Sequence, residues 1–191
     1  MDNRGQPMAL GMAGPNGAGK TTITAQILQE LQIATTVNAD AIAQGLAGTA
    51  SASVAFQAGR IMLTRIDELV DERQSFAFET TLSGLAYARK IQTWIEAGYG
   101  FHLVFVYLES PELAIQRVGQ RVLRGGHDIR RRYLKSIRNF CTTYQPLASS
   151  WILFDNSLIN MPRLVANGVG RSVNRIDLPE VWNDFLRKSK L

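Results

Sequence analysis

The feature that most constrains the fold is a glycine-rich segment near the start of the chain. Residues 14–21 read GPNGAGKT and follow the largely apolar run 7–13 directly. Glycines let the backbone turn sharply, so that several N–H groups can point inward at phosphate oxygens. A helix that begins at Gly19 adds the positive end of its dipole to that cradle. The spacing predicts a strand, a phosphate-binding loop and a helix, as in P-loop nucleotide-binding proteins.

Two side chains of this segment have predicted chemical roles, and ATP and Mg²⁺ are the predicted cofactors. Lys20 is expected to reach the β- and γ-phosphates, and the Thr21 hydroxyl is expected to bind Mg²⁺. Asn156 follows the last predicted parallel strand, where a loop commonly borders adenine in P-loop kinases, although it could instead make an Asx-turn. The predicted nucleotide-binding residues are Gly14, Pro15, Asn16, Gly17, Ala18, Gly19, Lys20, Thr21, Thr22 and Asn156.

Length and composition indicate one domain over residues 1–191. The chain has 46% hydrophobic and 19% charged residues, which is typical of a globular protein. It contains no run of roughly 18 apolar residues, so no membrane span is expected. Cys141 is its only cysteine and excludes an internal disulfide. These features favour a cytoplasmic protein.

Alternating strand and helix patterns predict a three-layer α/β/α fold with a mostly parallel, five-stranded sheet. A hairpin and a closing helix are expected in a C-terminal extension over about 159–191. The arginine-rich stretch of about 117–140 is expected to form the lid helices of a kinase. The expected strands are 7–13, 33–38, 75–78, 101–108 and 151–154; the expected helices are 19–32, 51–72, 84–97, 111–123 and 129–143; the hairpin strands are 163–166 and 172–176, and the last helix is 178–188.

Two carboxylates follow predicted strands. Asp40 comes after the strand 33–38, and Glu79 comes after 75–78. Ligands of open α/β sheets bind at the carboxyl ends of the strands, so Lys20, Asp40 and Glu79 are expected to converge on one crevice. A carboxylate there can orient an acceptor hydroxyl and take its proton. Position alone leaves a second interpretation of Asp40 open, as the N-cap of a following helix.

The net charge of +5 is concentrated in one stretch. Eight basic residues lie between positions 117 and 138: Arg117, Arg121, Arg124, Arg130, Arg131, Arg132, Lys135 and Arg138. Few aromatic residues interleave with them, so nucleic-acid binding is not expected. Arginines stabilise the charge of a transferring phosphoryl group, and two or three of these residues are expected to contact phosphate. Most of the others are expected to form a solvated helix surface.

Several segments together resemble the zeta-toxin-like P-loop kinases. They are GPNGAGKTT at 14–22, VNAD at 37–40, AGR at 58–60, FETTLSG at 78–84, RGGH at 124–127, RRRY at 130–133 and FDNS at 154–157. The resemblance covers roughly residues 8–160. The connector between RGGH and RRRY is shorter than the resemblance leads us to expect.

The resemblance implies an ATP-dependent phosphotransferase that acts on a hydroxyl of a nucleotide sugar, such as UDP-N-acetylglucosamine. It implies that Asp40 is the general base and that Arg60 holds the diphosphate of the substrate. It also implies that Arg121 and an arginine from 130–132, taken as Arg131, are catalytic residues that clamp the transferring phosphate. It implies that Glu79, with Thr80 or Thr81, contacts the sugar nucleotide. An antitoxin that blocks the ATP site is one implied partner. A non-catalytic ATP-binding protein is the remaining alternative.

Overall fold

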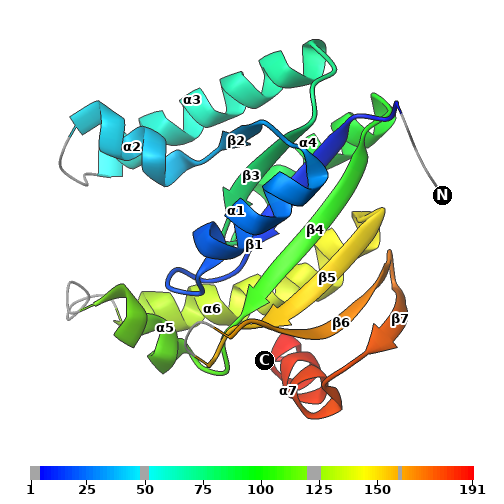
Figure 1. Cartoon of the computed structure of the whole chain (residues 1–191). Helices are drawn as coiled ribbons and strands as arrows, with labels where there is room; N and C mark the ends of the chain where they lie inside the picture. Colours follow the sequence, from blue (N-terminus) through cyan, green and yellow to red (C-terminus); the bar gives the residue numbers. More distant parts are fainter. Residues whose placement is uncertain (1–4, 48–51, 120–125, 159–160) are drawn as a thin grey trace.

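The computed structural model describes residues 5–47, 52–119, 126–158 and 161–191. Within them the strands form one sheet in the order β2-β3-β1-β4-β5-β6-β7 (Figure 1). From β2 to β5 every neighbouring pair is parallel, whereas β6 and β7 are antiparallel. The strands are β1 (Met8–Ala13), β2 (Thr35–Val37), β3 (Phe76–Thr80), β4 (Gly100–Tyr107), β5 (Ser150–Asp155), β6 (Arg163–Val169) and β7 (Ser172–Ile176).

The described sheet has seven strands rather than the five expected. The C-terminal hairpin forms as expected, but it extends the sheet instead of lying apart from it. β6 pairs with the edge of β5 from Trp151 opposite Gly168 to Asp155 opposite Arg163. Arg163 also forms an ion pair with the buried Asp155 carboxylate at 2.5 Å. Pairing with β6 satisfies backbone groups that would otherwise be exposed along β5.

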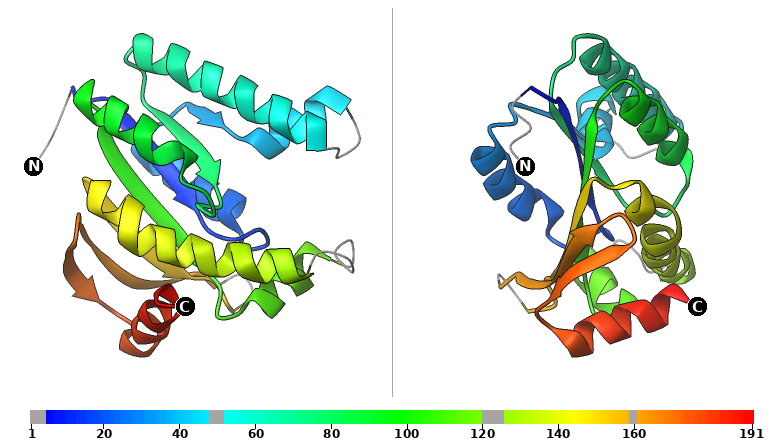
Figure 2. Two further views of the ribbon diagram at one scale, coloured as in Figure 1. Left: turned by 180° about the vertical axis from the view of Figure 1, so that it is seen from behind. Right: turned by 90° about the vertical axis from the view of Figure 1, so that its right-hand side faces the viewer.

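Helices cover both faces of the sheet, which confirms the three-layer α/β/α expectation (Figure 2). Figure 2 shows α1 on one face and α3, α4 and α6 on the other. The helix α2 was not expected, because it is short and begins directly after β2. The helices are α1 (Lys20–Leu31), α2 (Ala39–Ala47), α3 (Ala52–Asp71), α4 (Ala86–Glu96), α5 (Pro111–Val118), α6 (Gly126–Asn139) and α7 (Pro179–Ser189). In the described part of the chain, no helix is both long and apolar enough to cross a membrane.

The alternation of side chains along the strands gives each face its own apolar core. On β4, Phe105 belongs to the larger cluster under α3, α4, α6 and α7, whereas Val104 and Val106 belong to the smaller one under α1 and α5. Because β4 is buried on both faces, its sequence is apolar almost without interruption.

The last helix, α7, is fixed against the larger core. Phe185 is fully buried, and Trp182 stacks on Trp151 with ring centroids 5.8 Å apart. At the end of β4, Tyr107 donates a hydrogen bond to the Asp184 carboxylate, and Lys188 donates to the Tyr107 hydroxyl at 2.6 Å. The C-terminal segment is therefore an integral part of the fold.

Candidate active site

The phosphate loop connects β1 to α1 and requires glycine at both of its ends. Gly14 has φ +136°, and a Cβ there would lie 2.3 Å from the carbonyl oxygen of Val106. Gly19 has φ +83°, and a Cβ there would lie 2.5 Å from the side-chain nitrogen of Asn156. Any larger residue would therefore clash with neighbouring strands or loops, in addition to the backbone strain. The loop leads into the N-terminus of α1 at Lys20, as the sequence predicts.

Lys20 is held over this loop. Its side chain is 8% exposed and donates hydrogen bonds to the carbonyl oxygens of Gly14, at 3.0 Å, and Pro15, at 3.1 Å. Burial lowers the pKa of the Lys20 ammonium, and the negative charges of Glu79 and then Asp40 act against that lowering. The lysine and both carboxylates therefore share one electrostatic environment.

Two adjoining cavities contain the residues that were expected to converge. The first has a volume of about 640 Å³ and is lined by Asn16, Gly17, Gly19, Lys20, Thr21, Thr22, Asn38, Asp40, Ala41, Gln44 and Glu79. The second, of about 250 Å³, is lined by Asn16, Lys20, Asn38, Ala39, Asp40, Glu79, Thr80, Thr81, Tyr87 and Arg132. Lys20, Asp40 and Glu79 line both cavities, so the carboxyl ends of β1, β2 and β3 do meet in one crevice.

Asp40 is not the cap of α2. The side chain of Asn38 accepts a hydrogen bond from the backbone N–H of Asp40 at 2.8 Å, and the Ala41 N–H lies 3.4 Å from the same oxygen. Asn38 thus takes the capping role, and Asp40 stands in the first turn of the helix. The interpretation of Asp40 as an N-cap is wrong, and the residue lines both cavities instead.

The end of β3 and the residues that follow it form the other wall of the crevice. Glu79 lies one residue before the end of β3, where it pairs with Met12 of β1. The Thr80 hydroxyl accepts a hydrogen bond from the Leu82 N–H at 3.1 Å. The hydroxyls of Thr81 and Ser83 lie 2.9 Å apart. Glu79, Thr80 and Thr81 were all predicted substrate contacts, and the structure brings them together beside Lys20.

The predicted lid arginines are placed unequally. Arg132 lines the smaller cavity. Arg130 forms an ion pair with Glu112 on α5. Arg131 is exposed and lines neither cavity, so its catalytic role stays a prediction. Arg121 lies outside the described residues.

Asn156 contacts the phosphate loop from the opposite side. It is 8% exposed, and its side-chain nitrogen donates to the carbonyl oxygen of Ala18 at 2.7 Å. The Asx-type contact is made by its neighbour Asp155, which accepts from the Ser157 N–H at 3.0 Å. The oxygen of the Asn156 amide is buried without a hydrogen-bond partner in the described structure.

A separate cavity of about 510 Å³ lies beside Asn156. Its lining residues are Gly17, Gly19, Thr22, Ile23, Gln26, Arg117, Asn156 and Pro162. The Arg117 guanidinium donates to the carbonyl oxygens of Asn156, at 2.7 Å, and Ser157, at 3.0 Å. No local pattern indicates this role, because Arg117 is one of many arginines in the basic stretch. Only the fold brings the Arg117 side chain to Asn156 and Ser157, which lie 39 and 40 positions further along the chain.

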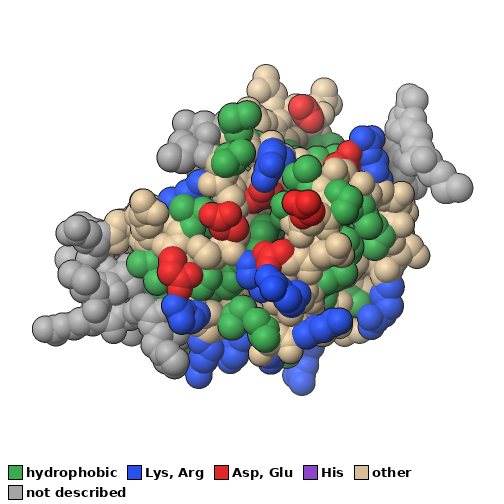
Figure 3. Space-filling view, turned by 90° about the horizontal axis from the view of Figure 1, so that it is seen from below, with side chains coloured by type: hydrophobic (Ala, Val, Ile, Leu, Met, Phe, Trp, Pro, Cys, Tyr) green, Lys and Arg blue, Asp and Glu red, His purple; other side chains and the backbone are tan. Residues whose placement is uncertain are grey.

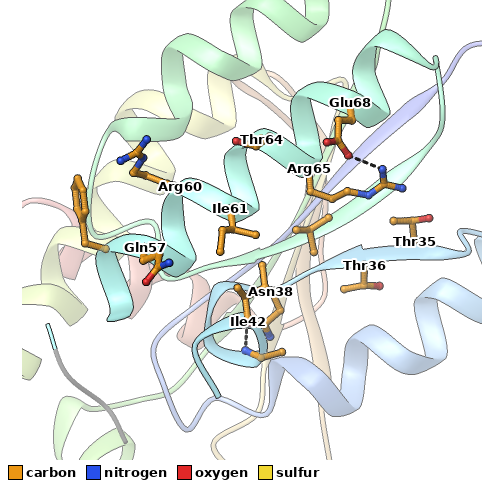
Figure 4. A pocket seen from close by; sticks show the side chains of 13 residues that line it. Thr35, Thr36, Asn38, Ile42, Gln57, Arg60, Ile61, Thr64, Arg65 and Glu68 are labelled. Carbon is orange, nitrogen blue, oxygen red and sulfur yellow. Dashed lines mark hydrogen bonds and ion pairs between the residues drawn. The ribbon is translucent and has the colours of Figure 1, made fainter. Parts of the chain in front are cut away.

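Arg60 lies apart from the crevice, in the middle of α3. It lines a groove of about 920 Å³ that runs between β2, α2 and α3. Figure 4 shows Ile61 directed toward Ile42 and Asn38, whereas Arg60 extends away from Asn38. The groove and the 640 Å³ cavity share Asn38 and Ala41 in their linings, so the two spaces adjoin. The groove is lined by Thr35, Thr36, Val37, Asn38, Ala41, Ile42, Phe56, Gln57, Arg60, Ile61, Thr64, Arg65 and Glu68.

The face seen from below in Figure 3 carries acidic and basic side chains side by side.

Comparison with known proteins decides the family. The family model described as zeta toxin matches residues 1–149, well over half of the chain. The chain belongs to the zeta toxin family. An uncharacterized protein of Haemophilus influenzae is 28% identical over 124 residues, which is 65% of this chain and 87% of that protein.

Solved structures share the fold of this zeta toxin family member. A chain from the PezAT toxin-antitoxin system of Streptococcus pneumoniae gives a TM-score of 0.67 at 16% identity, over 97% of this chain and 85% of its own length. A chain of the AvrRxo1-ORF1:-ORF2 complex with ATP gives 0.68 at 19% identity and covers 94% of this chain. The present chain spans only 63% of the length of that second protein. At these identities the likeness shows the fold. Family and fold together make the chain a P-loop phosphotransferase.

Proposed function

We propose that the protein transfers the γ-phosphate of ATP to a hydroxyl group of a nucleotide sugar such as UDP-N-acetylglucosamine. The observation that carries this proposal is the convergence of Lys20, Asp40 and Glu79 on two adjoining cavities at the carboxyl edge of the sheet. The convergence supplies a cation for the phosphates and carboxylates for an acceptor hydroxyl in one place.

The ATP half of the proposal rests on the phosphate loop and the cavity beside Asn156. The triphosphate would lie in the loop, where Lys20 exchanges its two carbonyl partners for phosphate oxygens. The base would occupy the 510 Å³ cavity, which Asn156 and Arg117 help to line. The AvrRxo1-ORF1:-ORF2 complex was crystallised with ATP, which supports the choice of nucleotide.

Mg²⁺ fits the residues present. It prefers oxygen ligands, and the Thr21 side chain lines the same cavity as the Asp40 and Glu79 carboxylates. Thr21 would hold the ion, which would neutralise charge on the phosphates.

The transfer step requires a base for the acceptor hydroxyl, and Asp40 is the proposed one. The acceptor oxygen forms a bond to the γ-phosphorus, while the bond between that phosphorus and the bridging oxygen of ADP breaks. The proton of the hydroxyl passes to the Asp40 carboxylate. Glu79, Thr80 and Thr81 would orient the sugar, and Arg121 and Arg131 would stabilise the transferring group. Arg132, which lines the smaller cavity, is a third arginine for this role.

The groove that adjoins the crevice supports an acceptor larger than a free sugar. A volume of about 920 Å³ exceeds what a single sugar ring requires. The groove combines apolar residues such as Ile42 and Ile61 with the cation Arg60. A base or ribose could lie on the apolar residues and a diphosphate near the arginine, which favours a nucleotide sugar over a free sugar.

The proposal is tested with labelled ATP, Mg²⁺ and a panel of UDP-N-acetylglucosamine, UDP-glucose, GDP-mannose and free N-acetylglucosamine. Labelled phosphate is expected on a nucleotide sugar and not on the free sugar. The Lys20→Ala protein serves as the control for contaminating kinases. Failure to label any nucleotide sugar, with ATP bound to the protein, would overturn the choice of acceptor.

A second candidate concerns the biological role rather than the chemistry. The PezAT chain comes from a toxin-antitoxin system, which supports a toxin that is restrained by an antitoxin protein. Expression of the wild-type chain should then arrest growth, and Lys20→Ala should relieve the arrest. Normal growth at matched expression levels would exclude this role.

A further inference from the structure

The loop that follows β3 is held by side chains from one distant segment. The Ser136 hydroxyl donates a hydrogen bond to the carbonyl oxygen of Thr81 at 2.5 Å. The side-chain amide of Asn139 donates one to the carbonyl oxygen of Leu82 at 2.7 Å. The Tyr144 hydroxyl donates to the carbonyl oxygen of Gly84, also at 2.7 Å. These three partners lie 55 to 60 positions away in the sequence. Three of the four carbonyls from residue 81 to residue 84 are thus bonded from α6 and the π-helical turn after it.

The held loop has a backbone that a free peptide would rarely adopt. Leu82 has φ +53° and is 1% exposed. A left-handed conformation is uncommon for a residue with a branched, bulky side chain and persists only where the surroundings enforce it. The loop's own short-range bonds, such as Leu82 N–H to Thr80, do not connect it to the rest of the fold. The left-handed conformation of Leu82 is therefore maintained by the burial of its side chain and by the three long-range hydrogen bonds.

The same helix carries an arginine into the crevice. Arg132, Ser136 and Asn139 are spaced by four and three residues, so they lie along one face of α6. Arg132 lines the cavity that Thr80 and Thr81 also line. On its buried side α6 is anchored by Tyr133 and Ile137, which are at most 1% exposed. The helix is thus joined to the loop by hydrogen bonds and to the core by buried side chains.

We propose that Ser136, Asn139 and Tyr144 are positioning residues for the phosphate acceptor. They contact neither ATP nor the acceptor, but they fix the distance between Arg132 and the Thr80–Thr81 side of the crevice. Their effect falls on the acceptor and not on ATP, because the phosphate loop and Asn156 are held by a separate set of bonds. The identity of the acceptor rests on the proposed function, whereas the claim that these three side chains hold the loop after β3 does not.

Kinetics with UDP-N-acetylglucosamine give the first test. Ser136→Ala and Asn139→Ala should each raise the KM for this substrate about tenfold, since each leaves a loop carbonyl without its partner. The dissociation constant for ATP should stay within about twofold. Ser136→Thr, which restores a hydroxyl, should recover most of the loss. Thr142→Ala is the matched control. The Thr142 hydroxyl donates a hydrogen bond to the carbonyl oxygen of Arg138 at 2.9 Å and lies close to the hydroxyl of Thr143, so both contacts stay within its own segment.

Amide hydrogen exchange gives a second test that needs no catalysis. Exchange in the peptide covering 79–87 should be at least about tenfold faster in Ser136→Ala and Asn139→Ala than in the wild type, while α1 is unchanged. Unchanged exchange in this peptide would overturn the inference even if the protein phosphorylates a different acceptor. Faster exchange combined with an unchanged KM, or with equal losses for ATP and UDP-N-acetylglucosamine, would overturn the positioning role.

Discussion

The side-chain amide of Asn156 donates a hydrogen bond to the carbonyl oxygen of Ala18 at 2.7 Å, across 138 positions of sequence. This bond joins the connection after β5 to the phosphate loop. It also leaves the amide oxygen buried and unpartnered beside the cavity that Arg117 and Pro162 help to line. One side chain thus links the conformation of the loop to the region proposed for the base.

Asn156→Ala should therefore weaken ATP binding by about tenfold, because the phosphate loop loses the hydrogen bond to its Ala18 carbonyl. The measurement is calorimetric titration with a non-hydrolysable ATP analogue. Asn174→Ala, at an exposed position of β7, is the control and should bind as the wild type does. Equal affinities of the wild type and Asn156→Ala would remove Asn156 from the nucleotide site.

Lys20→Ala should lower ATP affinity by roughly 10- to 100-fold, the range for hydrogen bonds to charged groups. The Lys20 ammonium is buried with its pKa lowered, so its loss should not destabilise the fold. Equilibrium binding of a fluorescent ATP analogue measures the first effect and thermal unfolding the second. Lys90→Ala removes a surface lysine paired with Asp67 and should change neither property. Wild-type affinity in Lys20→Ala would contradict the assignment of the loop.

The closing helix should contribute measurably to stability. Tyr107→Phe removes the hydroxyl that donates to Asp184 and accepts from Lys188, so the free energy of unfolding should fall by about 1–3 kcal/mol. Urea denaturation measures this change. Arg187→Ala removes only an exposed partner of Asp184 and should cost less than about 1 kcal/mol. If both variants unfold at the wild-type urea concentration, α7 is not held in this way.

His102 should make the fold sensitive to mild acid. Burial lowers the pKa of His102 below its usual 6.5, and its Nδ1 lies 2.7 Å from the Ser150 hydroxyl. Below about pH 6.5 the unfolded chain takes up a proton that the folded imidazole does not, so stability present above that pH is lost as the pH falls. His102→Gln should reduce the loss between pH 7.5 and 5.5, measured by urea denaturation. An identical pH dependence in wild type and variant would exclude this role of His102.

The fold was predictable where the sequence has a simple period. The buried strand β4 and the strand-loop-helix around Lys20 follow from apolar runs and glycine spacing. The sheet order and the pairing of β6 with β5 were not predictable, because they depend on contacts such as Arg163 with Asp155 that no local pattern records. The helix α2 was not predicted. Asn38 and Asp40 are both residue types that cap helices, so the residue at which a helix would begin could not be chosen from the sequence.

The site divides in the same way. Lys20, Asp40 and Glu79 could be foreseen because each follows a predicted strand, Lys20 by way of the phosphate loop, and parallel strands share their carboxyl edge. Arg117, Ser136 and Asn139 could not, because an arginine or a polar residue on a helix is usually solvated. What distinguishes them is the backbone carbonyl that each one meets in the folded chain.

Single-turnover phosphoryl transfer by Asp40→Asn tests the central claim most directly. Protein in excess over labelled ATP is mixed with Mg²⁺ and UDP-N-acetylglucosamine, and ATP affinity is measured on the same samples. Asp71→Asn, at the far end of α3, is the matched control. Transfer by Asp40→Asn should fall by about 10²- to 10⁴-fold, with ATP affinity within about threefold of the wild type. Transfer at the wild-type rate would contradict the role of Asp40 and, with it, the proposed catalytic site.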